Sequence, residues 1–102
     1  MIRHVVLFKL KFDVNVKTVD QVFLALKSLQ TKIPGILSIS TGHDNSPERL
    51  QRGHTHGFTV DFTDAAARDA YLPHPAHQAV GAMIVGITEG GVEGICVVDW
   101  EA

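Results

Sequence analysis

The chain contains little cysteine, no cluster of basic residues and no long hydrophobic run. Cys96 is the only cysteine among 102 residues, which excludes an intrachain disulfide and a cysteine-based zinc site. The formal net charge of −2, with lysine and arginine scattered along the chain, argues against nucleic acid or a membrane surface as the main partner. The longest apolar run, residues 5–8, is too short to span a bilayer, and no charged-then-apolar leader is recognisable. We therefore expect a cytoplasmic location.

Histidine is the compositional oddity of an otherwise ordinary chain. Hydrophobic residues make up 45% of it and charged residues 20%, as in a typical globular protein, and the length predicts a single domain over residues 1–102. Six histidines, however, stand against one tryptophan and one tyrosine. Because no terminal run suggests a purification tag, the histidines belong to the fold. They are His4, His43, His54, His56, His74 and His77.

Hydrophobic periodicity divides the chain into two strand–helix–strand units. Period-two alternation indicates strands, and apolar residues at helical spacing follow a capping box made by Thr18 and Gln21. The Pro34-Gly35 pair ends that first helix. The expected elements are strands over residues 3–12, 36–43, 54–62 and 92–100, and helices over 18–33, from 64 to about 72, and from 75 to the break at Gly90-Gly91.

This order predicts a ferredoxin-like α+β sandwich, βαββαβ, with a four-stranded antiparallel sheet and a second helix that is broken in two. Helices then cover one face of the sheet. The phenylalanine-rich faces of the first strand, as far as Phe12, and of the third strand, from His54, are expected to be that face. His4 and His56 therefore point inward.

The first and last strands also carry apolar residues on their other side. We assign Val5 and Leu7 of the first strand and Ile95 and Val97 of the last to this second face. Scattered surface valines are common and are one explanation. A solvent-exposed apolar sheet face is unusual in a monomer, so the better explanation is a homodimer in which the two sheets pack face to face.

The segment from Tyr71 to Val80, YLPHPAHQAV, places a phenol and two imidazoles around two prolines. Pro73 ends one helix, and Pro75 suits the first position of the next, which makes His74 the N-cap and His77 the third helical residue. The positive end of the helix dipole and apolar burial both disfavour a charged imidazole at this position. His77 is thus suited to be a neutral general base beside Tyr71 in an enclosed pocket; an incidental capping turn is the alternative.

Several polar side chains therefore point to one apolar interior. Burying an unsatisfied polar group costs about 1–3 kcal/mol, so such groups need partners, water or a ligand, and a polar cluster in an apolar pocket is typical of a small-molecule site. Because the first and third strands are antiparallel neighbours, His4 and His56 tend toward opposite ends. Metal binding is a rival use, since His54 with His56 and His74 with His77 have workable spacings. No cysteine or nearby carboxylate completes such a set, so we expect no metal.

Four stretches in order resemble the stress-responsive α/β-barrel (Dabb) family: HVVLFKLK at residues 4–11, IPGI at 33–36, THGF followed by VDF at 55–62, and Y with HPAH at 71–77. The resemblance covers nearly the whole chain. It implies ferredoxin-like protomers whose sheets pair into a dimeric α+β barrel. Most members of the family have no assigned activity, but the family includes a cyclase that closes a linear polyketide by aldol condensation without a metal or an organic cofactor.

The resemblance to that activity assigns roles residue by residue. Its catalytic tyrosine and histidine fall on Tyr71 and His77, and its supporting histidines fall on His4 and His56. A carboxylate that orients the catalytic histidine falls on Asp99. Pocket positions fall on Phe23 and on Leu26, where the cyclase has a tyrosine, and His54 replaces a tyrosine that is usual there, so the pocket and the substrate are expected to differ.

Three hypotheses for function follow. The first is a cofactor-independent lyase or cyclase of a small molecule, with His77 as the base and Tyr71 as the hydrogen-bond donor. The second is a ligand-binding or stress-response dimer of the same fold without catalysis. The third is a metal enzyme that uses the histidines as ligands, which the metal content of the purified protein would reveal.

Overall fold

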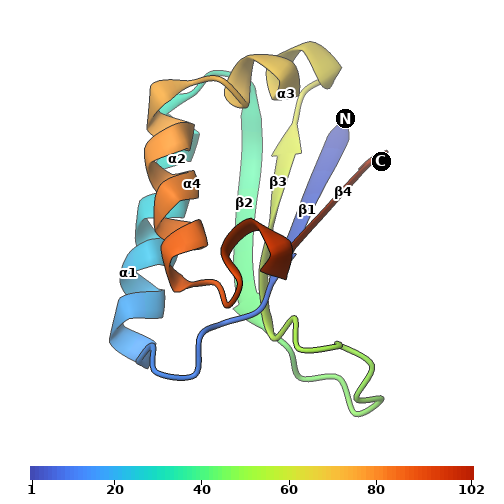
Figure 1. Ribbon diagram of the computed structural model, residues 1–102. Helices are drawn as coiled ribbons and strands as arrows, with labels where there is room; N and C mark the ends of the chain where they lie inside the picture. Colours follow the sequence, from blue (N-terminus) through green and yellow to red (C-terminus); the bar gives the residue numbers. More distant parts are fainter.

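A four-stranded antiparallel sheet, in the order β2-β3-β1-β4, is covered by helices on one face (Figure 1). The computed structural model describes all 102 residues and confirms the predicted ferredoxin-like α+β fold. The elements are β1 (Ile2–Phe8), α1 (Val16–Lys27), α2 (Leu29–Lys32), β2 (Ile36–His43), β3 (His56–Phe62), α3 (Ala65–Tyr71), α4 (Pro75–Ile87), a 3-10 turn η1 (Gly91–Gly94) and β4 (Ile95–Glu101).

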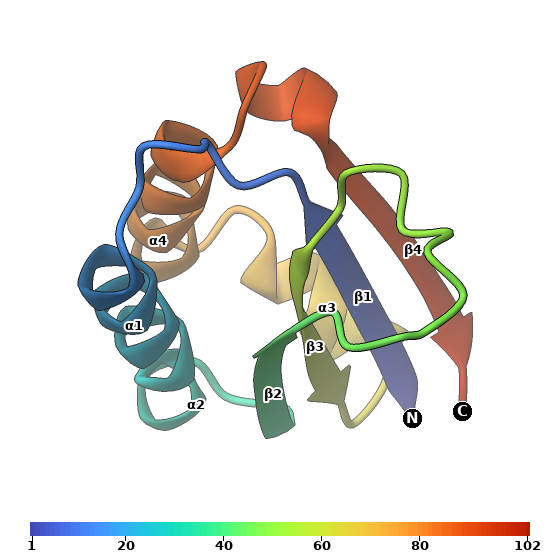
Figure 2. The same cartoon turned by 90° about the horizontal axis from the view of Figure 1, so that it is seen from below.

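The hydrophobic core lies between the sheet and the helices. Helices α1 and α4 pack side by side over the sheet, while α3 lies at one end of it (Figure 1, Figure 2). The inward strand residues form the floor of this core, and the buried face of each helix closes it. The best-buried large side chains are Phe8, Leu26, Leu29, Val60, Phe62 and Tyr71.

The first strand ends earlier than its alternation predicts. Phe8 pairs with His56 on β3 and with Ile95 on β4, and both neighbouring strands begin there. Beyond Phe8 no ladder partner remains, apart from an isolated bridge between Leu10 and Thr88. Phe12, which was predicted to face the core, is 99% exposed in a turn. The apolar pattern therefore continues past the point at which strand pairing ends.

The first helix begins at a different cap from the one predicted. The side chain of Asn15 accepts a hydrogen bond from the backbone N–H of Thr18, at 2.9 Å, so the helix starts at Val16 and Thr18 lies inside it. The helix is also interrupted at Ser28, whose hydroxyl donates to the carbonyl of Ala25 at 2.6 Å. Residues 29–32 then form the short helix α2, which continues the apolar pattern with the buried Leu29.

The third and fourth strands both start later than predicted. β3 begins at His56, which leaves His54 in the preceding loop, where its Nδ1 lies 3.2 Å from the carbonyl oxygen of Gln51. Residues 92–94, the first part of the predicted last strand, lie in the 3-10 turn η1 instead. The register also corrects the faces of β4. Because Val97 pairs with the inward Val6, Val97 and Ile95 face the helix layer and not the outer face.

Two glycines, Gly86 near the C-terminal end of α4 and Gly94 at the end of η1, provide a matched test of packing. A methyl group at Gly86 would meet no atom within 4 Å, whereas one at Gly94 would collide with the carbonyl oxygen of Glu89. We expect Gly86→Ala to stabilise the protein by about 0.5–1 kcal/mol through its helix propensity. Gly94→Ala should destabilise it by about 1–3 kcal/mol through overpacking. Urea unfolding measures both changes, and equal effects of the two substitutions would contradict this account.

Candidate functional site

Tyr71 and His77 lie together at the junction of α3 and α4, as predicted. Tyr71 is the last residue of α3, and the chain turns through Pro73 into α4, which starts at Pro75. His74 is the N-cap, and its Nδ1 accepts a hydrogen bond from the backbone N–H of Ala76 at 3.0 Å. This turn brings the rings of Tyr71 and His77 to 4.1 Å between centroids.

The neutral His77 ring has a defined tautomer. Its Nδ1 lies 2.9 Å from the carbonyl oxygen of Leu72, and since a carbonyl only accepts, Nδ1 carries the proton. Nε2 is then the unprotonated nitrogen. Desolvation by burial lowers the pKa of His77, and the nearby His4 and His74 lower it further, against the opposing effect of the Leu72 carbonyl. The ring is half-buried, so it is less enclosed than the sequence suggested.

Tyr71 is 1% exposed and packs in the core against Phe62, with 4.9 Å between ring centroids. Burial raises the pKa of Tyr71, so its hydroxyl stays protonated and can act as a donor. The hydroxyl makes no hydrogen bond within the chain. Because the structure has no fully buried side-chain oxygen or nitrogen without a partner, this hydroxyl retains some access to the surface. Tyr71 is therefore a buried ring with an available donor.

Asp99 orients a different histidine from the one expected. Its Oδ1 lies 2.7 Å from Nδ1 of His4, while His77 is held by a backbone carbonyl instead. The β1–β4 register explains this, because His4 and Asp99 are direct cross-strand partners. The other carboxylate oxygen accepts a hydrogen bond from Nη1 of Arg68 at 3.1 Å. The sequence patterns did not indicate Arg68 as a site residue. The only available sign was its position three residues before Tyr71, on the same face of α3.

His4 joins the Tyr71 site, but His56 does not. The rings of His4 and Tyr71 lie 6.1 Å apart between centroids. His56 pairs with Phe8, four residues further along β1, which corresponds to about 13 Å along the sheet. His56 therefore does not contact His77, although the supporting role implied by the resemblance would require it to lie nearby.

His56 belongs instead to a second cluster of rings at the other end of the sheet. Its neighbours are Phe8 and Phe23, at centroid distances of 5.9 and 6.4 Å, and His43, at 6.0 Å. Burial, followed by the influence of His43, lowers the pKa of His56. Of the two expected pocket residues, Phe23 thus lies beside His56, and Leu26 is packed in the core.

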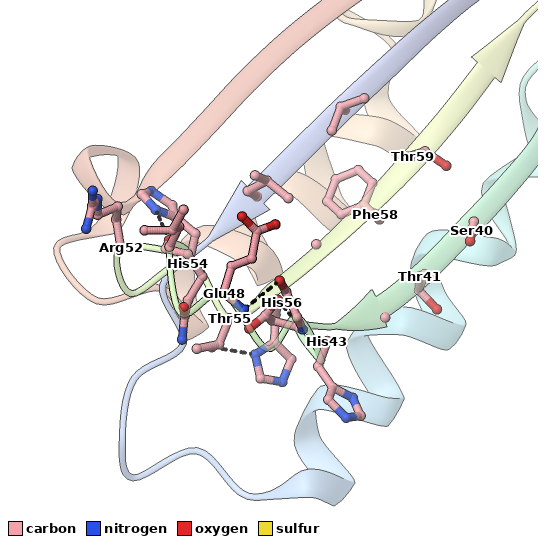
Figure 3. A pocket seen from close by; sticks show the side chains of 18 residues that line it. Ser40, Thr41, His43, Glu48, Arg52, His54, Thr55, His56, Phe58 and Thr59 are labelled. Atoms are coloured by element: carbon pink, nitrogen blue, oxygen red, sulfur yellow. Dashed lines mark hydrogen bonds between the residues drawn. The ribbon is translucent and has the colours of Figure 1, made fainter.

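A hollow of about 710 Å³ lies near this end of the sheet, away from Tyr71. It is bounded by the loop of residues 44–55, which projects from the side of the sheet opposite the helices (Figure 1, Figure 2). Val5 and Leu7 of β1 contribute apolar surface to it, and most of the remaining lining is polar. Figure 3 shows His43 and His56 next to each other at its edge.

The histidine spacings that suggested a metal do not form a ligand set. His54 and His74 are each engaged with the backbone, at the carbonyl of Gln51 and the N–H of Ala76. No group of three or more histidine, cysteine, aspartate or glutamate side chains is placed so that it could hold a metal ion.

No helix is both long and apolar enough to cross a membrane.

Residues 2–102 match the Stress responsive A/B Barrel Domain family, Dabb. The chain belongs to this family. It is 28% identical over 88 residues to a stress-response A/B barrel domain-containing protein from Arabidopsis thaliana, covering 85% of this chain and 77% of that one. It is also 25% identical over 80 residues to olivetolic acid cyclase from Cannabis sativa, covering 78% and 79% of the two chains.

Among solved structures, one ferredoxin-like protein has the same fold over almost its whole length. That protein, from Jannaschia sp. CCS1, is described as dimeric and of unknown function. It is 32% identical, with a TM-score of 0.89, and the alignment covers 99% of this chain and 98% of that one.

Proposed function

We propose that this Dabb protein is a homodimeric, cofactor-independent lyase or cyclase that acts on a small carbonyl compound. The observation that carries the proposal is the tautomer of His77. With Nδ1 donating to the Leu72 carbonyl, Nε2 is left as a base next to the protonated Tyr71 hydroxyl. The similarity to olivetolic acid cyclase supports the reaction class, and the dimeric Jannaschia structure supports the oligomeric state.

The two side chains divide the work of an aldol-type reaction. Nε2 of His77 removes a proton from the carbon next to a carbonyl, which produces an imidazolium and an enolate. The Tyr71 hydroxyl donates a hydrogen bond to the oxygen on which the negative charge develops. The enolate carbon then forms a bond to a second carbonyl carbon, and the new alkoxide takes the proton back from His77. The reverse sequence cleaves the same bond, as in a lyase.

Proton exchange at the α-carbon tests this chemistry without knowledge of the natural substrate. The full chain is incubated in D2O with a panel of methyl ketones and β-keto thioesters, and deuterium uptake is followed by proton NMR. We expect faster exchange than with free imidazole at the same concentration for at least one compound class. Compounds that shift the resonances of Tyr71 and His77 but exchange no faster than in buffer would contradict the proposal.

The second candidate is a ligand-binding dimer without catalysis. It is favoured by the packing of Tyr71, which is almost completely buried and contacts Phe62 and His4 as a core residue would. Binding without exchange in the same experiment would support this candidate over the first.

A further inference from the structure

Three side chains from three elements form a continuous chain of contacts behind Tyr71. Arg68 of α3 donates from Nη1 to Oδ2 of Asp99 on β4, at 3.1 Å, and Asp99 Oδ1 lies 2.7 Å from Nδ1 of His4 on β1. The Nε of Arg68 donates in turn to Asp69 at 2.9 Å. Both oxygens of Asp99 are therefore occupied, one by a guanidinium and one by an imidazole.

This arrangement determines which nitrogen of His4 carries the proton. A carboxylate that is bound by a guanidinium accepts hydrogen bonds through both oxygens, so Nδ1 of His4 is the donor. In the neutral ring Nε2 is then unprotonated. No hydrogen bond within the chain uses Nε2, and because no fully buried side-chain nitrogen lacks a partner, this atom retains access to the surface.

Arg68 also holds Asp99 in place. The guanidinium and the imidazole hold the carboxylate from opposite sides, so Arg68 helps to fix the position in which Asp99 meets His4. The titratable and charged groups around His4 are Asp99 from β4, Arg68 and Tyr71 from α3, and His77 from α4.

We propose that Arg68 is a positioning residue that acts through Asp99 to fix the orientation of His4 at the Tyr71–His77 site, with Nδ1 as the nitrogen that donates to the carboxylate. The ring of Tyr71 is flanked by both imidazoles, at centroid distances of 6.1 Å for His4 and 4.1 Å for His77. The inference rests on the proposed function, and it narrows the substrate class.

With both imidazoles neutral, the site offers one hydrogen-bond donor, the Tyr71 hydroxyl, and two acceptors, the Nε2 atoms of His4 and His77. A complementary ligand presents one carbonyl oxygen and two protons that can be given to acceptors. A carbonyl compound with an acidic α-carbon and a separate hydroxyl or enol group has this pattern. A simple ketone would leave the acceptor on His4 without a partner, which costs binding energy.

Nitrogen NMR of the full chain with labelled histidine tests the relay without any substrate. Long-range proton–nitrogen spectra near neutral pH distinguish the two neutral tautomers from the imidazolium. In the neutral ring of wild-type His4 we expect the proton on Nδ1 and an unprotonated Nε2. In Arg68→Met the carboxylate of Asp99 loses one of its two partners, so we expect the single His4 tautomer to be replaced by a mixture of the two, with a weaker unprotonated Nε2 resonance.

Two further variants keep the test specific. Arg68→Lys keeps a positive charge near Asp99 and should restore most of the wild-type Nε2 resonance. Asp69→Asn removes only the exposed partner of Arg68 and should leave the His4 spectrum unchanged. A wild-type His4 with its proton on Nε2, or a folded Arg68→Met protein with an unchanged His4 spectrum, would overturn the proposal. Since no substrate is involved, this outcome is independent of the α-proton exchange that tests the proposed function.

Discussion

His77→Ala is expected to lower the rate of α-proton exchange by about 10²- to 10⁴-fold, the usual contribution of a positioned general base. The thermal stability should hardly change, because alanine is a good residue in the first turn of a helix and the ring is only half-buried. His74→Ala is the matched control from the same turn. It removes the N-cap of α4, so it should cost about 1 kcal/mol of stability and leave the exchange rate within a small factor of wild type.

The pH dependence of exchange follows from the direction of the His77 shift. Desolvation lowers the pKa of His77 below its ordinary value of 6.5, so the base is mainly unprotonated at pH 7, and the exchange rate should level off as the pH rises above neutral. As the pH falls through the lowered pKa, the rate should fall with the fraction of neutral ring. The folded state also prefers the neutral form, so protonation of His77 below pH 6.5 should reduce stability. A rate that rises only above pH 7, or an active His77→Ala variant, would remove His77 from the role of base.

The parts of the site that depend on local chain geometry could be predicted from the sequence. Two prolines separated by one residue end one helix and start the next, and this determines the positions of His74 and His77 without any knowledge of the tertiary structure. Strand alternation likewise placed His4 on the inward face, and antiparallel pairing correctly separated it from His56.

The parts that depend on register could not be predicted in this way. Asp99 serves His4 and not His77 because β4 starts at Ile95, after a 3-10 turn, which makes Asp99 the cross-strand partner of His4. The contact with Arg68 requires the position of α3 over the end of the sheet, and no local pattern contains this information. Apolar alternation also continues to Phe12, although the pairing partners end at Phe8. Periodicity records which face a residue would occupy, and only pairing decides whether a strand exists there.

The proposed function also includes a homodimer, and the outer face of the sheet is the expected dimer contact. Val5 and Leu7 of β1 stand beside Val98 and Cys96 of β4, with Trp100 further along the same strand. Leu7, Val98 and Trp100 are 43%, 52% and 48% exposed, so the single chain leaves a contiguous apolar surface in water. In a two-fold dimer the same patch is buried on both subunits, and every substitution in it acts twice.

Leu7→Asp is therefore expected to weaken the dimer by about 10²-fold or more. The substitution places an unpaired carboxylate at the centre of the contact on each subunit, and loss of a single central contact in an interface already costs about 2 kcal/mol. The fold of the monomer should survive, because Leu7 is partly exposed there. Leu24→Asp introduces the same charge at a more exposed leucine on α1, on the helix side, and should leave the dimer intact. Sedimentation equilibrium at micromolar concentration measures all three proteins. A monomeric wild type, or equal masses for the two aspartate variants, would show that the outer sheet face is not the dimer interface.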